Sequence, residues 1–458
     1  EQYHEKKLYQ FLHSNFKLTE FRNGQRECML ELMKGRSLIY IQKTGSGKSL
    51  LFEMAALVME GIVIVLVPLK ELIANHARSA SEKGIPYMAY HSETDATQLT
   101  AIKASIAKRE PLREKLFLIT PERMLSDDFR TTVLEPLYDQ NRIALFVFDE
   151  IHVASGWGKD FRPNCRNADF RDAYARVPCL MLTASATSAT LADVQRQFRL
   201  QDAVVYRGDV NRPNIDYSVM GTMQLTGTKE RTIVNFLKQK FQKPVAGIIY
   251  VLSIQNTALV ATMLTEELRS GGWVTAAFHA QLPPDVKSRL MDDWLAGRIH
   301  IMVSTCALGM GIDKRDIHFV VHHSITRDID AFYQESGRGA RDAAITAYSL
   351  CFYEPSLSKW FIKSWKDELE TAVITKATYE EKLRKLEAIQ EYCKTRGCRR
   401  SFLVKYFNPM ETPVCNGMCD NCRNGSAKKA GGQKDMRDFM VQRKWNAHLL
   451  DPKKKINK

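Results

Sequence analysis

The sequence predicts two α/β domains with parallel sheets, followed by a small helical module that carries clustered cysteines. Three observations support this fold class. The chain has 458 residues, which is more than one hydrophobic core usually serves. Continuous apolar runs alternate with helical stretches in the first half, and the same pattern starts again in the second half. The apolar runs stop near residue 354, and five of the ten cysteines fall between residues 393 and 422.

The apolar runs have the length and composition of strands that helices cover on both faces. Such strands appear as continuous stretches of Val, Ile, Leu and Phe. We therefore expect parallel strands at 38–41, 62–67, 116–119, 143–148 and 179–182 in the first domain, and at 247–251, 299–303, 319–321 and 347–350 in the second.

The domain boundaries are expected where this pattern is interrupted. The segment 206–213 contains Gly, Asp, Asn and Pro, which favour turns, and it is the predicted linker. We expect one domain at 1–206, a second at 207–353, a helical hairpin module at 354–425, and a basic, flexible tail at 426–458.

The composition is that of a folded, basic protein. Apolar residues make up 45% and charged residues 26% of the chain, which excludes a wholly disordered or fibrous protein. No apolar run approaches the ~18 residues of a membrane span, so no membrane partner is expected. The net charge of +14 favours a polyanionic partner through counterion release. The segment 426–458 holds eight Lys and two Arg against three Asp, so half of this surplus lies there.

A phosphate-binding loop is predicted at 42–49, where Gln-Lys-Thr-Gly-Ser-Gly-Lys-Ser follows the strand 38–41 and opens a helix. Glycines let backbone N–H groups surround a phosphate, and the helix N-terminus favours its negative charge. Lys48 is expected to bind the β- and γ-phosphates of a nucleoside triphosphate, and Ser49 to ligate Mg²⁺. A chance Gly-Ser-Gly-Lys turn is the alternative, and the strand–loop–helix context argues against it. Gln42 stands where the general pattern has its first glycine.

Two further groups of charged residues fit the chemistry of phosphate hydrolysis. Asp149 and Glu150 follow the apolar run 143–148; Asp149 is expected to hold Mg²⁺, and Glu150 to orient or deprotonate the attacking water. Arg338 and Arg341 would share one face if their segment is helical. An arginine supplied across a domain interface stabilises charge on the γ-phosphate. The alternatives are a surface acidic pair and a solvated basic helix end.

Together these residues resemble the superfamily 2 helicases, and within them the RecQ family, from about residue 10 to residue 422. The matching segments are 21–25, 44–49, 68–72, 120–123, 149–152, 183–187, 211–214, 309–313 and 334–342. The resemblance implies two RecA-like domains with ATP in the cleft between them. It implies nucleotide contacts from Arg22, Gln25, Thr44, Gly45, Ser46, Gly47, Lys48, Ser49, Gly311, Asp313 and Gln334, with Gln25 on the adenine.

The segment 155–163 resembles the aromatic-rich loop of RecQ enzymes, which touches single-stranded DNA and relays that contact to ATP hydrolysis. The resemblance implies DNA contacts from Trp157, Lys159, Phe161 and Arg162. Aromatic faces stack on bases, and cations meet phosphates. A packed core tryptophan is the alternative, although the glycines on both sides of Trp157 favour a loop.

The clustered cysteines indicate a metal site, because no secretory signal pattern precedes them. Their arrangement resembles the RecQ zinc module, which implies Cys398, Cys415, Cys419 and Cys422 as zinc ligands. Four thiolates suit a closed tetrahedral structural site. Cys393 is expected to be a bystander.

The resemblance, which is greatest to the eukaryotic RecQ-one type, implies a nuclear, ATP-dependent 3′–5′ DNA helicase that acts in DNA repair and recombination. Its cofactors would be ATP, Mg²⁺ and Zn²⁺, and its partners single-stranded and duplex DNA. The alternatives are a catalytically impaired nucleic-acid-binding scaffold and an RNA helicase. The chain departs from the family pattern at Lys43, Lys159, Ser185 and the Gly339–Ala340 pair, which inverts the usual Ala-Gly order.

Overall fold

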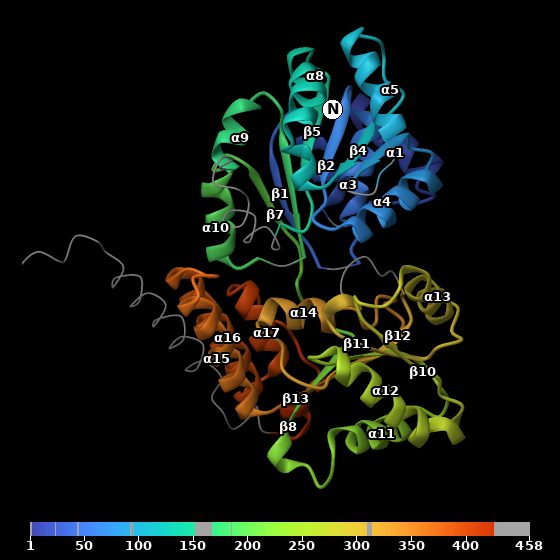
Figure 1. Cartoon of the computed structure of the whole chain (residues 1–458), viewed down its shortest axis with the longest axis vertical. Coiled ribbons are helices and arrows are strands. Elements are labelled where there is room, and N and C mark those ends of the chain that lie inside the picture. Colours follow the sequence, from blue (N-terminus) through green and yellow to red (C-terminus); the bar gives the residue numbers. More distant parts are fainter. Residues whose placement is uncertain are drawn as a thin grey trace, which may run out of the picture. The chain divides into compact units, whose positions relative to one another are not determined.

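The computed structural model describes residues 2–22, 24–43, 45–91, 94, 96–151, 167–184, 186–308 and 314–425. These residues form two compact units, and the chain passes from the first to the second between Val210 and Asn211. Each unit is built around one parallel sheet (Figure 1), as the sequence predicts.

The first unit holds a seven-stranded sheet with the order β3-β4-β2-β5-β6-β1-β7. All neighbouring strands run parallel. The strands are β1 Leu38–Ile41, β2 Ile62–Leu66, β3 Tyr87–Tyr90, β4 Leu116–Ile119, β5 Ile143–Phe148, β6 Cys179–Thr183 and β7 Val204–Arg207. The helices are α1 Gln2–Ser14, α2 Gln25–Met33, α3 Ser49–Val58, α4 Lys70–Glu82, α5 Ala96–Ala107, α6 Pro121–Met124, α7 Asp127–Phe129, α8 Glu135–Asp139, α9 Asn167–Ala173 and α10 Ser188–Gln197.

Both faces of the central strands of this sheet are buried, because their alternate residues enter different cores. In β1, Leu38 and Tyr40 pack with helices α1 to α4. Ile39 and Ile41 pack on the other face with α5 and the segment 124–137. Burial on both sides explains why the central strands are apolar throughout.

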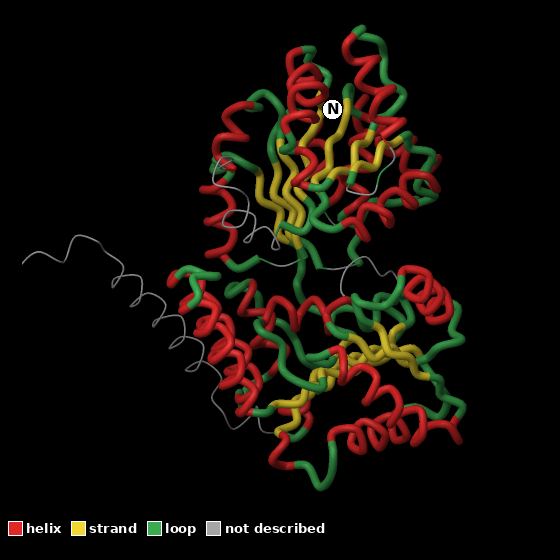
Figure 2. The backbone as a smooth tube through the Cα atoms, in the orientation of Figure 1, coloured by secondary structure: helices red, strands yellow, loops and turns green. Residues whose placement is uncertain are grey.

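The second unit holds a six-stranded sheet with the order β10-β11-β9-β12-β13-β8, again parallel. Figure 2 shows the strands in yellow. The strands are β8 Ile215–Gly221, β9 Ala246–Tyr250, β10 Thr275–Phe278, β11 Ile301–Ser304, β12 Ile317–His322 and β13 Ala347–Tyr353. The helices beside it are α11 Lys229–Lys240, α12 Ile254–Leu268, α13 Pro284–Leu295 and α14 Ile329–Ser336. Helices α11 and α12 share one core with the strands.

The helical module follows β13 and belongs to the second unit. It consists of α15 Pro355–Glu370, α16 Lys376–Lys394, α17 Arg399–Phe407 and α18 Asp420–Arg423. Tyr392 of α16 packs on Phe332 of α14, with ring centroids 4.9 Å apart. None of the described helices combines the length and the apolar character needed to cross a bilayer.

Candidate functional site

The segment after β1 has the backbone of a phosphate-binding loop. Gly45 and Gly47 have φ angles of 79° and 85°, in the left-handed region that glycine adopts most readily. Helix α3 begins directly afterwards at Ser49, with Lys48 at its N-cap. The Lys48 ammonium donates a hydrogen bond to the Gln42 carbonyl oxygen at 3.2 Å. The loop and the helix N-terminus together can bind an anion.

Arg22 and Gln25 lie against this loop. The Arg22 guanidinium donates to the Gly45 carbonyl at 2.7 Å, and the Gln25 amide donates to the Gly47 carbonyl at 3.0 Å. Gln25 is 1% exposed and accepts a hydrogen bond from the Arg22 backbone N–H. A Cβ on Gly47 would stand 3.0 Å from the Gln25 amide nitrogen. Both residues therefore brace the phosphate loop.

The unusual Gln42 fits because of a glycine far away in the sequence. Gly208 lies beside Gln42, and a Cβ at Gly208 would come within 2.2 Å of the Gln42 side chain. The Gly208 N–H donates to the Ile41 carbonyl at 2.8 Å, and Tyr206 stacks on Tyr40 at 5.2 Å between centroids. The segment 206–208 is therefore part of the first unit's sheet edge, a role that sequence reasoning missed.

The acidic pair lies at the carboxyl end of β5. Asp149 is 5% exposed, and its two carboxylate oxygens face His76 Nε2 at 2.9 Å and the Glu150 backbone N–H at 3.0 Å. Burial raises the pKa of Asp149, but the hydrogen bond and charge of His76 and the charge of Lys48 outweigh burial, so the net pKa is lowered. The structure thus brings Lys48 and Asp149 into one electrostatic site.

His76, on α4, is a site residue that sequence reasoning missed. Burial lowers its pKa, but hydrogen bonding to Asp149 and the nearby carboxylates outweigh burial and raise it. His76 also packs edge-on against Phe52, with centroids 5.1 Å apart. Because its only sequence signal was a position shortly after the segment 68–72, the pairing across 73 residues was not predictable.

Arg338 and Arg341 do not lie on a helix face. Helix α14, which carries Gln334, ends at Ser336, and both arginines follow it in a segment that we call the arginine loop (337–342). Arg338 is 6% exposed. Ala340 has a φ of 49°, which is unusual for a residue with a side chain. Glycine, which is unfavourable inside helices, stands at position 337 directly after Ser336 and again at position 339.

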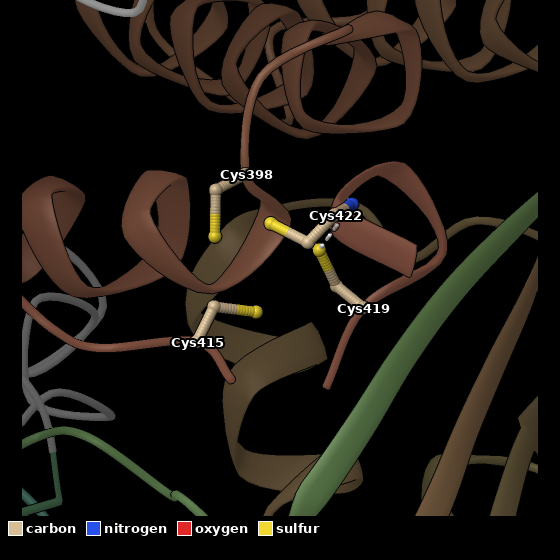
Figure 3. Close-up of side chains that lie close together, drawn as sticks. All are labelled: Cys398, Cys415, Cys419 and Cys422. Carbon is tan, nitrogen blue, oxygen red and sulfur yellow. Dashed lines mark hydrogen bonds between the residues drawn. The ribbon is translucent and has the colours of Figure 1, made fainter. Parts of the chain in front are cut away.

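The four expected cysteines converge in the helical module (Figure 3). Their sulfur atoms all lie within 4.8 Å of one another. A tetrahedral zinc with Zn–S bonds of about 2.3 Å needs sulfurs about 3.8 Å apart, so the set fits this ion with a small contraction. Cys398 caps α17 and Cys419 caps α18, each accepting a backbone N–H at 3.4 Å.

The thiols of the cluster differ in acidity. Hydrogen bonds from Cys398 and from backbone N–H groups lower the pKa of Cys419, because they stabilise its thiolate, while the hydrogen bond to Cys419 raises the pKa of Cys398. Cys393 is buried on α16 and lies outside the four-sulfur cluster.

Several predicted site residues lie outside the described part of the chain. These are Thr44 of the phosphate loop, Trp157, Lys159, Phe161 and Arg162 of the aromatic loop, Gly311 and Asp313, and the departure at Ser185.

Three family models match the chain in succession. The model for DEAD/DEAH box helicases matches residues 22–194, and that for the helicase conserved C-terminal domain matches 228–343. These two matches, with the phosphate loop, place the chain in the class of helicase-type proteins with two RecA-like domains. The model for RecQ zinc-binding matches residues 361–423 and so includes the four-cysteine centre. The chain belongs to the RecQ family.

Individual relatives agree with this assignment. ATP-dependent DNA helicase Q1 of Pongo abelii is 30% identical over 424 residues, which are 92% of this chain and 63% of the relative. A Caenorhabditis briggsae relative that carries the Q1 name is also 30% identical, over 429 residues, which are 93% of this chain and 67% of the relative. The chain thus spans only part of the length of its relatives, 63% and 67% of these two and 58% of ATP-dependent DNA helicase Q-like 2 of Arabidopsis thaliana.

A solved structure shares the fold. Mycobacterium smegmatis helicase Lhr bound to ssDNA and AMP-PNP matches 91% of this chain and 56% of its own chain, with a TM-score of 0.56 and 17% identity.

Proposed function

We propose that the chain is an ATP-dependent DNA helicase that moves 3′ to 5′ along single-stranded DNA and unwinds duplex DNA. The observation that carries this proposal is the phosphate-binding loop, in which Gly45 and Gly47 have left-handed backbone and Lys48 leads into helix α3, together with the buried Asp149 at the carboxyl end of β5. A phosphate-binding loop together with a carboxylate at the end of another strand of the same sheet forms the catalytic site of nucleoside triphosphatases. The relatives that are named DNA helicases support DNA as the nucleic acid along which the chain moves.

The described residues supply most of the roles that hydrolysis requires. Backbone N–H groups of Gly45, Ser46 and Gly47, with the Lys48 ammonium, would bind phosphates, and Ser49 with Asp149 would hold Mg²⁺. When bound, Mg²⁺ neutralises phosphate charge. Glu150 would orient or deprotonate water. The remaining nucleotide contacts are assigned to Arg22, Gln25, Thr44, Gly311, Asp313 and Gln334, and stabilisation of the transition state to Arg338 and Arg341.

The DNA contacts are assigned to the aromatic loop. Trp157 and Phe161 would stack on bases, and Lys159 and Arg162 would meet phosphates. In domain terms, 1–206 would bind ATP, 207–353 would supply the arginine loop, 354–425 would bind zinc, and 426–458 would add basic charge. We place the protein in the nucleus, in DNA repair and recombination.

The test is ATP hydrolysis with and without single-stranded DNA, followed by unwinding of duplexes with a 3′ or a 5′ tail. Lys48→Ala should lose both activities, because it removes the charge at the phosphates. Glu150→Gln should bind ATP but turn over at less than about a tenth of the wild-type rate. DNA-stimulated hydrolysis that survives Lys48→Ala, or unwinding only from a 5′ tail, would contradict the proposal. A catalytically impaired scaffold would bind DNA without stimulated turnover, and an RNA helicase would prefer RNA.

A further inference from the structure

Two buried arginines connect the cysteine centre to the arginine loop. Arg400 follows the metal-ligand position Cys398 by two residues and is 1% exposed. Arg212 belongs to the segment that enters the second unit and is 6% exposed. Both lie within the second unit, as does the arginine loop. We refer to these two residues and their hydrogen bonds as the arginine relay.

Arg400 holds the segment that carries Arg212. Its guanidinium donates to the carbonyl oxygen of Arg212 and to the side-chain oxygen of Asn211, the latter at 3.0 Å. It also donates to the carbonyl oxygens of Pro213 at 3.4 Å and Ile215 at 2.6 Å. One side chain of the cysteine module thus donates to four acceptor oxygens between residues 211 and 215.

Arg212 in turn holds the arginine loop. Its guanidinium donates to the carbonyl oxygens of Gly337 at 2.6 Å, Gly339 at 2.7 Å and Ala340 at 3.0 Å. The Asn214 amide adds hydrogen bonds to the carbonyl oxygens of Ala340 at 2.9 Å and Ile345 at 3.1 Å. The acceptors on either side of Arg338 are therefore fixed by the segment that Arg400 binds.

The cysteine module is anchored at the far end of the relay as well. The Tyr217 N–H of β8 donates to the Met418 carbonyl at 3.2 Å, and the Val219 N–H donates to the Asp420 carboxylate at 2.9 Å. Arg423 forms an ion pair with Asp216 at 2.5 Å. Since Cys419 lies between Met418 and Asp420, a metal-ligand position is attached directly to the edge strand of the second sheet.

Burial of the two guanidinium groups of the arginine relay costs free energy that packing alone would not justify. No ion pair neutralises Arg212 or Arg400 among the residues that the structure describes, so two guanidinium charges are buried on carbonyl oxygens. Apolar side chains of similar volume often fill such space at equal or greater stability. A guanidinium adds a planar set of N–H donors with fixed directions. Donors in this arrangement hold the backbone carbonyl oxygens that they bind in fixed positions.

We propose that Arg400 and Arg212 are positioning residues that fix the arginine loop against the cysteine module, so that an intact metal centre is needed to place Arg338 and Arg341 for ATP hydrolysis. The inference rests on the proposed function for its catalytic consequence. Its structural part, the ordering of the arginine loop through Arg400, holds without any nucleotide and can be measured separately.

The kinetic test compares Arg400→Met with Arg399→Met. Arg399 is the control for damage to the module, because it precedes Arg400 in α17, is 5% exposed, and binds Asp420 and the Tyr392 carbonyl. Arg399→Met therefore disturbs the Asp420 anchor but leaves the contacts of Arg400 with the segment 211–215 in place. Misplacing a catalytic group by about 1 Å can cost about 10²-fold in rate. We expect Arg400→Met to lower kcat for DNA-stimulated ATP hydrolysis by about 10- to 100-fold, with KM for ATP within about twofold. Arg399→Met, with equal zinc content, should lose less than about threefold.

The structural test is hydrogen exchange without nucleotide. The N–H groups of Ala340 and Asp342 donate to the carbonyl oxygens of Ile317 and Arg315, so they are protected while the arginine loop is in place. Arg400→Met should speed their exchange by at least about tenfold and leave strand β1 unchanged. If Arg400→Met does not fold, Asn214→Ala removes the half-buried amide and should give a smaller change in the same direction in both tests.

The two proposals fail in different ways. A wild-type protein without ATP hydrolysis would contradict the proposed function, while the exchange measurement would still decide the relay. A folded Arg400→Met protein with unchanged kcat or unchanged exchange at 340–342 would overturn the relay. Equal losses in Arg399→Met and Arg400→Met would also overturn it, because they would indicate general damage to the module.

Discussion

The arginine loop has the order Gly339–Ala340, which inverts the usual Ala-Gly order, and the space around position 339 explains why glycine stands there. A Cβ at position 339 would stand 2.8 Å from the Ala347 Cβ, so position 339 requires glycine. Ala340 bears the left-handed backbone instead, with a φ of 49°. A left-handed conformation costs a residue with a side chain roughly 1–2 kcal/mol, so the loop of this protein is strained at a position where glycine would be at ease.

Replacing Ala340 by glycine should relieve this strain. The greater freedom of glycine in the unfolded chain offsets part of the gain, so we expect Ala340→Gly to raise the free energy of unfolding by about 0.5–1 kcal/mol in urea denaturation. Gly339→Ala, the matched change, should lower it by about 1–3 kcal/mol through overpacking against Ala347. Destabilisation by Ala340→Gly would show that the left-handed backbone carries no strain.

His76 should tune the metal that Asp149 is proposed to hold. Partners that orient a ligating group typically contribute 10- to 100-fold in metal affinity. We expect His76→Ala to raise the Mg²⁺ concentration for half-maximal ATP hydrolysis by about tenfold. His76→Gln keeps a donor for the Asp149 oxygen and should shift it less. An unchanged Mg²⁺ dependence in His76→Ala would assign the pair to stability alone.

His323 gives a prediction for pH. Burial lowers its pKa below the ordinary 6.5, and this outweighs the hydrogen bond to Glu230. At pH values between the lowered pKa of His323 in the folded protein and its ordinary pKa, the unfolded chain binds more protons than the folded protein. The free energy of unfolding should therefore fall as pH drops from about 7.5 to 5.5. The denaturation midpoints measured at these two pH values should therefore lie closer together in His323→Asn than in the wild type. Equal pH dependence in both proteins would contradict this assignment.

At the scale of elements, the sequence predicts the interior of each sheet and misses its edges. The four strands without a prediction, β3, β7, β8 and β10, are the edge strands of the two sheets. Central strands are buried on both faces and read as apolar runs. Edge strands are partly exposed, as in the Val204–Arg207 strand, where no residue is fully buried. Their sequence therefore carries a weaker signal.

The candidate site likewise contains residues that could be predicted from the sequence and residues that could not. Residues contiguous in sequence, such as the phosphate loop and the Asp149–Glu150 pair, were predictable because strand, loop and helix follow one another. His76, Gly208 and Arg212 were not, because each acts on a segment far away in the chain. Arg338 and Arg341 would share one face only if their segment were helical, and this condition is not met, because α14 ends at Ser336.

The cysteine centre yields a prediction for the helical module. Structural zinc contributes on the order of 10–16 kcal/mol in small modules. We expect one zinc per chain by metal analysis, and its loss in Cys419→Ser should make the region 393–425 sensitive to limited proteolysis. Cys393→Ser is the matched control and should retain zinc, because Cys393 lies outside the cluster. Zinc retained in Cys419→Ser, or lost in Cys393→Ser, would overturn the ligand assignment.

At the scale of the whole molecule, the +14 charge should act on DNA affinity. Deleting residues 430–458 removes eight Lys and Arg. On single strands each lost phosphate contact lowers the salt dependence of log K by about 0.7. Since a charged segment of this kind rarely contacts phosphates with all of its charges at once, we expect the slope of log K against log salt concentration to change by about 2 to 4. Base preference should stay the same, because phosphate contacts do not read sequence. An unchanged slope would assign the charge effect to residues 1–429.

The arginine relay also decides what could be learned about it from a collection of related sequences. Most of its acceptors are main-chain carbonyl oxygens, at Arg212, Pro213 and Ile215 for one guanidinium and in the arginine loop for the other. A substitution at an acceptor position exchanges the side chain and leaves the carbonyl in place. The two arginines can therefore persist while the residues they bind drift. Correlated substitution, which reports pairs of side chains that change together, would miss this contact.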